Sequence, residues 1–276
     1  MLVYGIDFTS APSRTKPIVV AVCHPRPGQL DLHQLLRIRD LGAFEKSLRE
    51  PGPWVAAMDF PFGLPDRLIR DLDWPPKWSR YTKQVAALTR SEFENLLQLY
   101  MAVAPKGQKL LRRKTDASAG ALSPMKLHYV PLAKMYYEGA TRLRASGLNV
   151  LPCRPTDDSR IVLEGYPGLA ARQLIGRRSY KITIRGQQKQ ARHDARVEIV
   201  RALTGNKALD LYGFRVDIGS FLLEELVDDS LGDLLDAVLC ATQAGWALAK
   251  RSDGYGIPPD CNAHEGWIVD PGNRPL

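Results

Sequence analysis

Residues 2–8 (LVYGIDF) and 54–60 (WVAAMDF) are short apolar runs that each end in an aspartate followed by a phenylalanine. Such runs are typical of buried β-strands when turn residues follow, here TSAP after the first run and PFGLP after the second. Each pattern therefore places a carboxylate, Asp7 or Asp59, at the end of a buried strand. Burying a carboxylate is costly unless a cation or hydrogen bonds compensate it, so these positions predict a functional site.

The order of the predicted elements indicates an α/β fold. Residues 17–23 (PIVVAVC) and 29–36 predict two further strands, and a helix at 42–49 precedes the run at 54–60. A group of strands followed by a helix and another strand is a typical opening of an α/β domain. Downstream, the apolar periodicity predicts a strand at 160–165 and helices at 167–174, 188–203 and 230–250.

The stretch at about 61–155 differs in character because many prolines interrupt its helical patterns. It predicts an irregular, mainly helical insertion, with helices at 91–103 and 129–145 and a brief strand at 148–151. We expect residues 1–276 to form a single domain that contains this insertion.

Composition limits the class of protein. The hydrophobic content of 45% and the charged content of 25% are typical of a globular protein. A net charge of +8 favours a polyanionic partner such as nucleic acid. The scattered cysteines lack zinc-ligand spacing, and no phosphate-binding glycine loop is present. We expect a cytoplasmic protein without a membrane partner, because neither a signal peptide nor a long apolar helix is evident.

Three further acids extend the predicted site. Glu164 ends a third apolar strand in RIVLEGYP, and Asp233 and Asp236 lie one turn apart in the last predicted helix, within DLLDAVLCA. A second interpretation is structural, in which the strand acids cap turns, Glu164 pairs with an arginine, and Asp233 caps its helix.

Carboxylates that gather without basic partners repel one another unless a cation neutralises them, and hard oxygen ligands favour Mg²⁺ or Mn²⁺. One or two such ions would activate water for the hydrolysis of phosphodiester bonds. The predicted metal ligands are Asp7, Asp59, Glu164, Asp233 and Asp236, and all of these except Asp233 are also predicted catalytic residues.

With these acids in this order, the sequence resembles the RNase H-like superfamily, and within it the predicted-nuclease family called domain of unknown function 429. The segments that carry the resemblance are GIDFTSAP, MDFPFGLP, RRKTDASAGALSPMK, EGYPGLAARQL, SYKITIRGQQKQAR, LLDAVLCATQA and EGWIV. The resemblance implies a mixed five-stranded sheet flanked by helices, with the first three strands antiparallel and Asp7 beside Asp59. The final helix of related junction resolvases also carries acids, which Asp233 and Asp236 match, whereas Glu164 rests on the narrower family.

Basic residues near the acids are candidate substrate contacts. Lys181 is predicted to act in catalysis beside the acids, and Lys189 and Arg192 to bind a phosphate backbone, together with nearby Arg185. Arg113 is predicted to bind substrate too, although it is also placed to pair with Asp116 three residues away. A solvated helix face is the alternative for the segment that carries Lys189 and Arg192.

These observations predict a metal-dependent nuclease that acts on DNA or RNA, and a second copy of the chain is a candidate partner. A module that binds nucleic acid or protein without turnover is the main alternative. A relative of actin-like ATPases and sugar kinases is less well supported, because position 8 is phenylalanine where such proteins need a loop glycine, and no second phosphate loop is evident.

Overall fold

The computed structural model describes residues 1–182 and 189–275. Its described strands form one mixed sheet in the order β5-β6-β4-β1-β2-β3-β7. The strands are β1 (Leu2–Asp7), β2 (Ile18–Arg26), β3 (Gln29–Ile38), β4 (Trp54–Met58), β5 (Asn149–Val150), β6 (Arg160–Glu164) and β7 (Arg215–Ile218).

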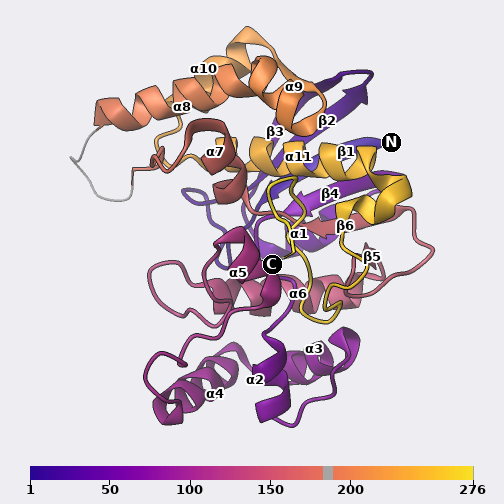
Figure 1. Ribbon diagram of the computed structural model, residues 1–276, viewed down its shortest axis with the longest axis vertical. Helices are drawn as coiled ribbons and strands as arrows, with labels where there is room; N and C mark the ends of the chain where they lie inside the picture. Colours follow the sequence, from indigo (N-terminus) through magenta and orange to yellow (C-terminus); the bar gives the residue numbers. More distant parts are fainter. Residues whose placement is uncertain (183–188, 276) are drawn as a thin grey trace.

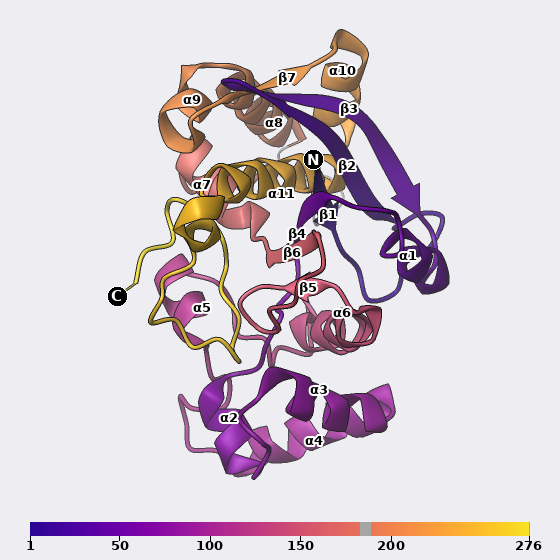
Figure 2. The same cartoon turned by 90° about the vertical axis from the view of Figure 1, so that its right-hand side faces the viewer.

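The strand pairing at the centre of the sheet agrees with the pairing that the resemblance implies. β1 and β2 pair antiparallel, as do β2 and β3, whereas β4 lies parallel to β1 on its other side and β6 lies parallel to β4 (Figure 2). All five residues of β4 are buried, which explains why its sequence is apolar throughout instead of alternating.

The expectation of five strands was wrong, because the described sheet has seven. The additional strands lie at the two edges. β5 is two residues long and coincides with the brief strand predicted at 148–151, while β7 is a four-residue strand that the sequence analysis missed. A strand as short as β7 gives too few alternations for recognition from the sequence alone.

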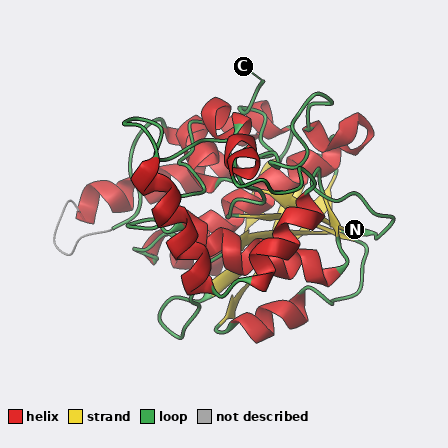
Figure 3. Ribbon diagram, turned by 90° about the horizontal axis from the view of Figure 1, so that it is seen from below, coloured by secondary structure: helices red, strands yellow, loops and turns green. Residues whose placement is uncertain are grey.

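Helices cover both faces of the sheet (Figures 1 and 3). They are α1 (Leu41–Ser47), α2 (Asp66–Asp71), α3 (Trp78–Ala87), α4 (Arg90–Val103), α5 (Lys114–Ala119), α6 (Leu132–Ser146), α7 (Pro167–Ile175), α8 (Lys189–Thr204), α9 (Asn206–Tyr212), α10 (Ser220–Asp228), α11 (Asp233–Ala249) and the 3₁₀ helix η1 (Arg251–Gly256). The stretch at 61–155 contains α2 to α6 and β5.

The two faces have separate apolar cores, and strand alternation sends each residue to one of them. Val3, Val55 and Leu163 join the core beneath α7 to α11. Ile6 and Met58 join the core on the opposite face, beneath α1, α3 and α6. Among the described helices, none combines the length and the apolarity that crossing a membrane requires.

Candidate metal centre

Asp7 and Asp59 are brought together by the parallel pairing of β1 with β4. Asp7 is the last residue of β1, and Asp59 directly follows β4 and donates its backbone N–H to the carbonyl of Ile6 at 2.9 Å. By alternation both side chains share the face of Val3 and Val55, which is the face that α11 covers. The carboxyl ends of parallel strands are where open α/β sheets usually place their ligands.

The third acid reaches this point because α11 lies unusually close to β1. A Cβ atom on Gly5 would lie 1.9 Å from the carbonyl oxygen of Ala237 and 2.1 Å from the amide nitrogen of Ala241, so only glycine permits this approach. Asp236 stands in the first turn of α11. As a result, one carboxylate oxygen from each of Asp7, Asp59 and Asp236 lies within 4.8 Å of the others.

These three residues, called the acidic triad below, are electrostatically unfavourable together. Burial raises the pKa of Asp7 well above its usual value, and the Asp236 carboxylate raises it further. Burial and the same neighbour raise the pKa of Asp59 to about 7. Within the described residues, no protein group donates a hydrogen bond to the carboxylate of Asp7 or Asp59. The oxygen-only donor set fits Mg²⁺ or Mn²⁺, which would relieve this repulsion.

Lys181 supplies one positive charge to the acidic triad. Its ammonium group donates to Oδ2 of Asp236, and the hydroxyl of Tyr180 donates to Oδ1 at 2.5 Å. Burial by itself would lower the pKa of Lys181, but the carboxylates of Asp236 and Asp7 outweigh it and raise the pKa, so the ammonium stays charged. Arg196 of α8 holds this segment through the carbonyl of Tyr180 at 2.9 Å.

The family model described as "Protein of unknown function (DUF429)" matches residues 5–260. The chain belongs to this family. The matched range contains the acidic triad and Lys181, so the candidate centre lies within the part that defines this family of unknown function. No curated protein and no solved structure matches the chain. The match to residues 5–260 confirms the resemblance to domain of unknown function 429.

Asp233 lies beside the acidic triad without joining it. Lys16, in the loop between β1 and β2, donates to both of its carboxylate oxygens at 2.6 and 2.7 Å. The alternative role as a capping residue is not observed either, because α11 begins at Asp233 and the carboxylate of Asp229 accepts from the amide of Leu234. Asp233 is therefore already neutralised by a lysine.

Glu164 points away from the acidic triad and does not gather with the other predicted metal ligands. Its strand register pairs it with Met58, so alternation sends it to the opposite face of the sheet from Asp7. There Arg113 donates to both of its carboxylate oxygens, at 2.6 and 2.8 Å, and the amide of Phe62 donates to one of them at 2.9 Å.

Arg113 is buried in the same network, and its predicted contact with substrate stays a prediction. Its side chain is 1% exposed and is also paired with Asp116 at 2.6 Å. Both alternatives that the sequence left open, an arginine partner for Glu164 and an aspartate partner for Arg113, are therefore realised in one buried network.

Of the other basic residues, Lys189 is exposed at the start of α8 and Arg192 is half-buried one turn later. Both are accessible enough for the predicted contact with phosphates, which stays a prediction. Arg185 lies outside the described residues.

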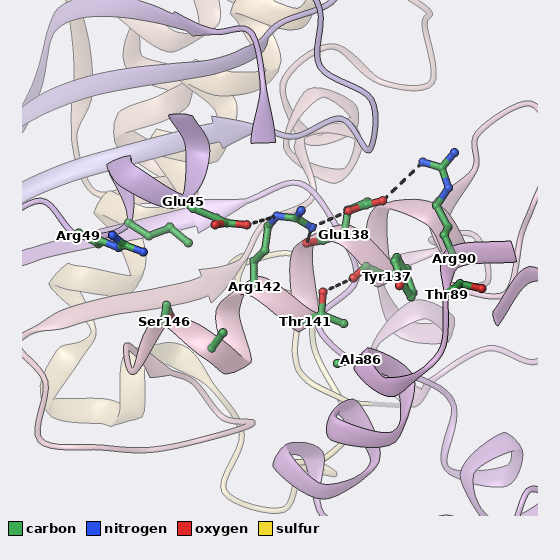
Figure 4. A pocket seen from close by; sticks show the side chains of 12 residues that line it. Glu45, Arg49, Ala86, Thr89, Arg90, Tyr137, Glu138, Thr141, Arg142 and Ser146 are labelled. Carbon is green, nitrogen blue, oxygen red and sulfur yellow. Dashed lines mark hydrogen bonds and ion pairs between the residues drawn. The ribbon is translucent and has the colours of Figure 1, made fainter. Parts of the chain in front are cut away.

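A cavity of about 720 Å³ contains none of the predicted site residues (Figure 4). Its charged side chains largely neutralise one another, since Arg142 pairs with Glu45 at 2.9 Å and with Glu138 at 2.5 Å. Arg90 approaches the same Glu138 at 3.5 Å. Among the described residues, unpaired negative charge is therefore found at Asp7 and Asp59 of the acidic triad and not in this cavity.

Three residues in or beside the centre were missed from the sequence. Tyr180 precedes Lys181 directly, and a hydroxyl next to a predicted catalytic lysine is a usable signal. Gly5 lies inside a buried strand, where glycine often marks the close approach of another backbone. Lys16 gives no signal, because its partner Asp233 is 217 positions away in the sequence.

Proposed function

We propose that this chain is a divalent-metal-dependent nuclease with an RNase H-like core. The observation that carries the proposal is the convergence of Asp7, Asp59 and Asp236 from β1, the end of β4 and α11. The order β3-β2-β1-β4, with the first three strands antiparallel, is the arrangement that the RNase H-like resemblance implies. The net charge of +8 supports a polyanionic substrate.

The charge of the centre favours one ion. When all groups are ionised, the three carboxylates of the acidic triad and the ammonium of Lys181 leave a net charge of −2. A single Mg²⁺ or Mn²⁺ neutralises that charge, whereas two ions would leave an excess of positive charge in a largely buried site. Such an ion, when bound, lowers the pKa of water and stabilises the charge that develops on a phosphate.

The protein groups have separate tasks in this proposal. Asp7 and Asp59 hold the ion from rigid strand ends, which fixes its position relative to the sheet. Tyr180 orients the Asp236 carboxylate through its hydroxyl. Lys181, whose side chain is 33% exposed, is close enough to solvent to place a second positive charge on the scissile phosphate.

A module that binds nucleic acid or protein without turnover is the second candidate. The observation in its favour is the ion pair between Lys181 and Asp236, because a lysine that already neutralises an acid reduces the need for a metal. The two candidates differ in whether divalent ions bind at all.

The direct test is a cleavage assay with structured DNA and RNA in Mn²⁺ and in EDTA. The variants are Asp7→Asn and Asp59→Asn, and Asp217→Asn on the exposed side of β7 is the matched control. We expect cleavage by the wild type and the control only in Mn²⁺, with at least about a hundredfold loss in each triad variant. Activity that survives both triad substitutions would contradict the assignment. Nucleic-acid binding without cleavage or Mn²⁺ binding would favour the second candidate.

A further inference from the structure

A small recess opens beside the acidic triad at the carboxyl ends of β4 and β6. It has a volume of about 120 Å³, and Asp59 of the triad forms part of its lining. Since a water molecule occupies about 30 Å³ in the liquid, the recess holds a group several times larger than a water. Asp59 is the residue that the recess shares with the acidic triad, and the rest of the lining lies past the ends of β4 and β6, toward the face of the sheet that carries Glu164. A substrate whose phosphate lies at the triad would reach the recess by passing these strand ends.

The walls of the recess are mainly apolar. Leu122 and Val130 line its outer part and are 48% and 45% exposed, although both are large apolar residues. Met135 of α6 and the ring of Tyr166 line it further in, and the guanidinium of Arg172 packs 5.2 Å from the centre of that ring. Exposed apolar side chains that surround a recess beside polar groups are typical of a ligand site.

The inner lining includes the buried network of Arg113, Asp116 and Glu164. One guanidinium and two carboxylates give this network a net charge of −1, because Arg113 is the cation shared by both acids. Negative charge at this end disfavours a second phosphate and favours a neutral group that carries N–H donors. The apolar walls at the same time favour a flat ring system.

We propose that this recess, called the base subsite below, receives the base of an unpaired nucleotide next to the scissile phosphate. The proposal deepens the nuclease assignment and rests on it for the position of the phosphate. A neutral ring with exocyclic amino groups matches both the apolar walls and the net charge of the inner lining. A base stacked within a duplex cannot enter a recess, so the preferred substrate has an unpaired base near the cleaved bond.

Binding of two matched duplexes tests the base subsite. One duplex is fully paired, and the other carries a single unpaired 2-aminopurine flanked by phosphorothioate linkages that slow hydrolysis. Stacking of a base on protein side chains contributes about 1–3 kcal/mol, so the wild type should bind the second duplex about 5- to 150-fold more tightly in Mg²⁺. The 2-aminopurine fluorescence should change on binding.

Two substitutions at the exposed rim, Leu122→Asp and Val130→Asp, should each reduce this preference to about twofold or less. Leu99→Asp is the matched control, because the substitution adds the same charge at a leucine of α4 that is 71% exposed and lies outside the recess. It should keep the full preference. Retained stabilisation by Mn²⁺ would show that each variant is folded.

Equal affinity of the wild type for the two duplexes would overturn the base subsite, as would a preference that both rim variants keep. The nuclease assignment is tested separately by cleavage of the same duplexes in Mn²⁺. A preference without cleavage contradicts the nuclease and leaves the base subsite standing. Cleavage without a preference supports the nuclease and contradicts the base subsite.

Discussion

Replacing Asp59 by asparagine should stabilise the metal-free protein increasingly as the pH rises, and should remove its response to Mn²⁺. The cause is the raised pKa of Asp59, about 7 in the folded protein against a usual value of 3.8. Between these values the folded protein holds a proton that the unfolded chain has released. The stability contributed by this proton is complete below about pH 4 and is lost as the pH rises to about 7.

The size of the effect follows from the same two values. Each pH unit between them corresponds to about 1.4 kcal/mol, so wild type loses at most about 4 kcal/mol through Asp59 over this window. Coulomb's law gives a similar size, about 3 kcal/mol or more for one pair of charges within 4.8 Å of each other at an effective dielectric constant of about 20. A buried asparagine amide offsets part of the gain, so we expect Asp59→Asn to gain about 2–4 kcal/mol on wild type by about pH 7.

Urea unfolding in EDTA and in Mn²⁺, at about pH 4.5 and about pH 7, measures this difference in the free energy of unfolding. At about 100 times its dissociation constant, Mn²⁺ should stabilise wild type by about 2.7 kcal/mol at about pH 7 and leave Asp59→Asn unchanged. Asp217→Asn should follow wild type in all four conditions. An unchanged difference in the free energy of unfolding between Asp59→Asn and wild type at the two pH values in EDTA would refute the role given to the Asp59 carboxylate. Stabilisation of Asp59→Asn by Mn²⁺ would refute it too.

Three other substitutions test separate parts of the structure. Gly5→Ala should lower the free energy of unfolding by about 3 kcal/mol or more, because its Cβ would overlap the backbone of α11. Calorimetry should also show that Mn²⁺ binding is lost. Unchanged stability would show that α11 is not held this close to β1. Lys181→Gln should tighten Mn²⁺ binding about tenfold in calorimetry, because the metal no longer competes with an ammonium for Asp236. The same substitution should slow cleavage. Weaker Mn²⁺ binding would argue against this competition. Arg113→Met should lower the free energy of unfolding in urea by about 3–5 kcal/mol, because Glu164 is left buried without its cation. Mn²⁺ should still stabilise this variant. A loss of stabilisation by Mn²⁺ would place Glu164 among the metal ligands.

Much of the central sheet could be predicted because its strands are apolar and end at recognisable turns. Asp7 and Asp59 stood out for the same reason, since a carboxylate in an apolar run has no packing role. Asp236 was identifiable because the residues on either side of it, Leu234, Leu235 and 237–239, are all apolar. The helix was predicted to begin at about residue 230, where capping would not explain an acid at position 236, whereas α11 begins at Asp233 and includes Asp236 in its first turn.

The remaining features depend on contacts that no local pattern records. The register of β6 against β4 decides that Glu164 faces Arg113 and not the acidic triad, and a shift of one residue would reverse this. The alternation within each strand contains this information, but it becomes usable only once the pairing is known. The partnership of Lys16 with Asp233 depends entirely on tertiary structure.

Anomalous diffraction at the manganese edge, from crystals of the wild type grown with Mn²⁺, tests the central claim most directly. We predict one ion, bound by oxygens of Asp7, Asp59 and Asp236 at about 2.1–2.2 Å, with Glu164 still paired to Arg113. An empty acidic triad with Lys181 in contact with Asp236, at Mn²⁺ concentrations that support cleavage, would contradict the claim.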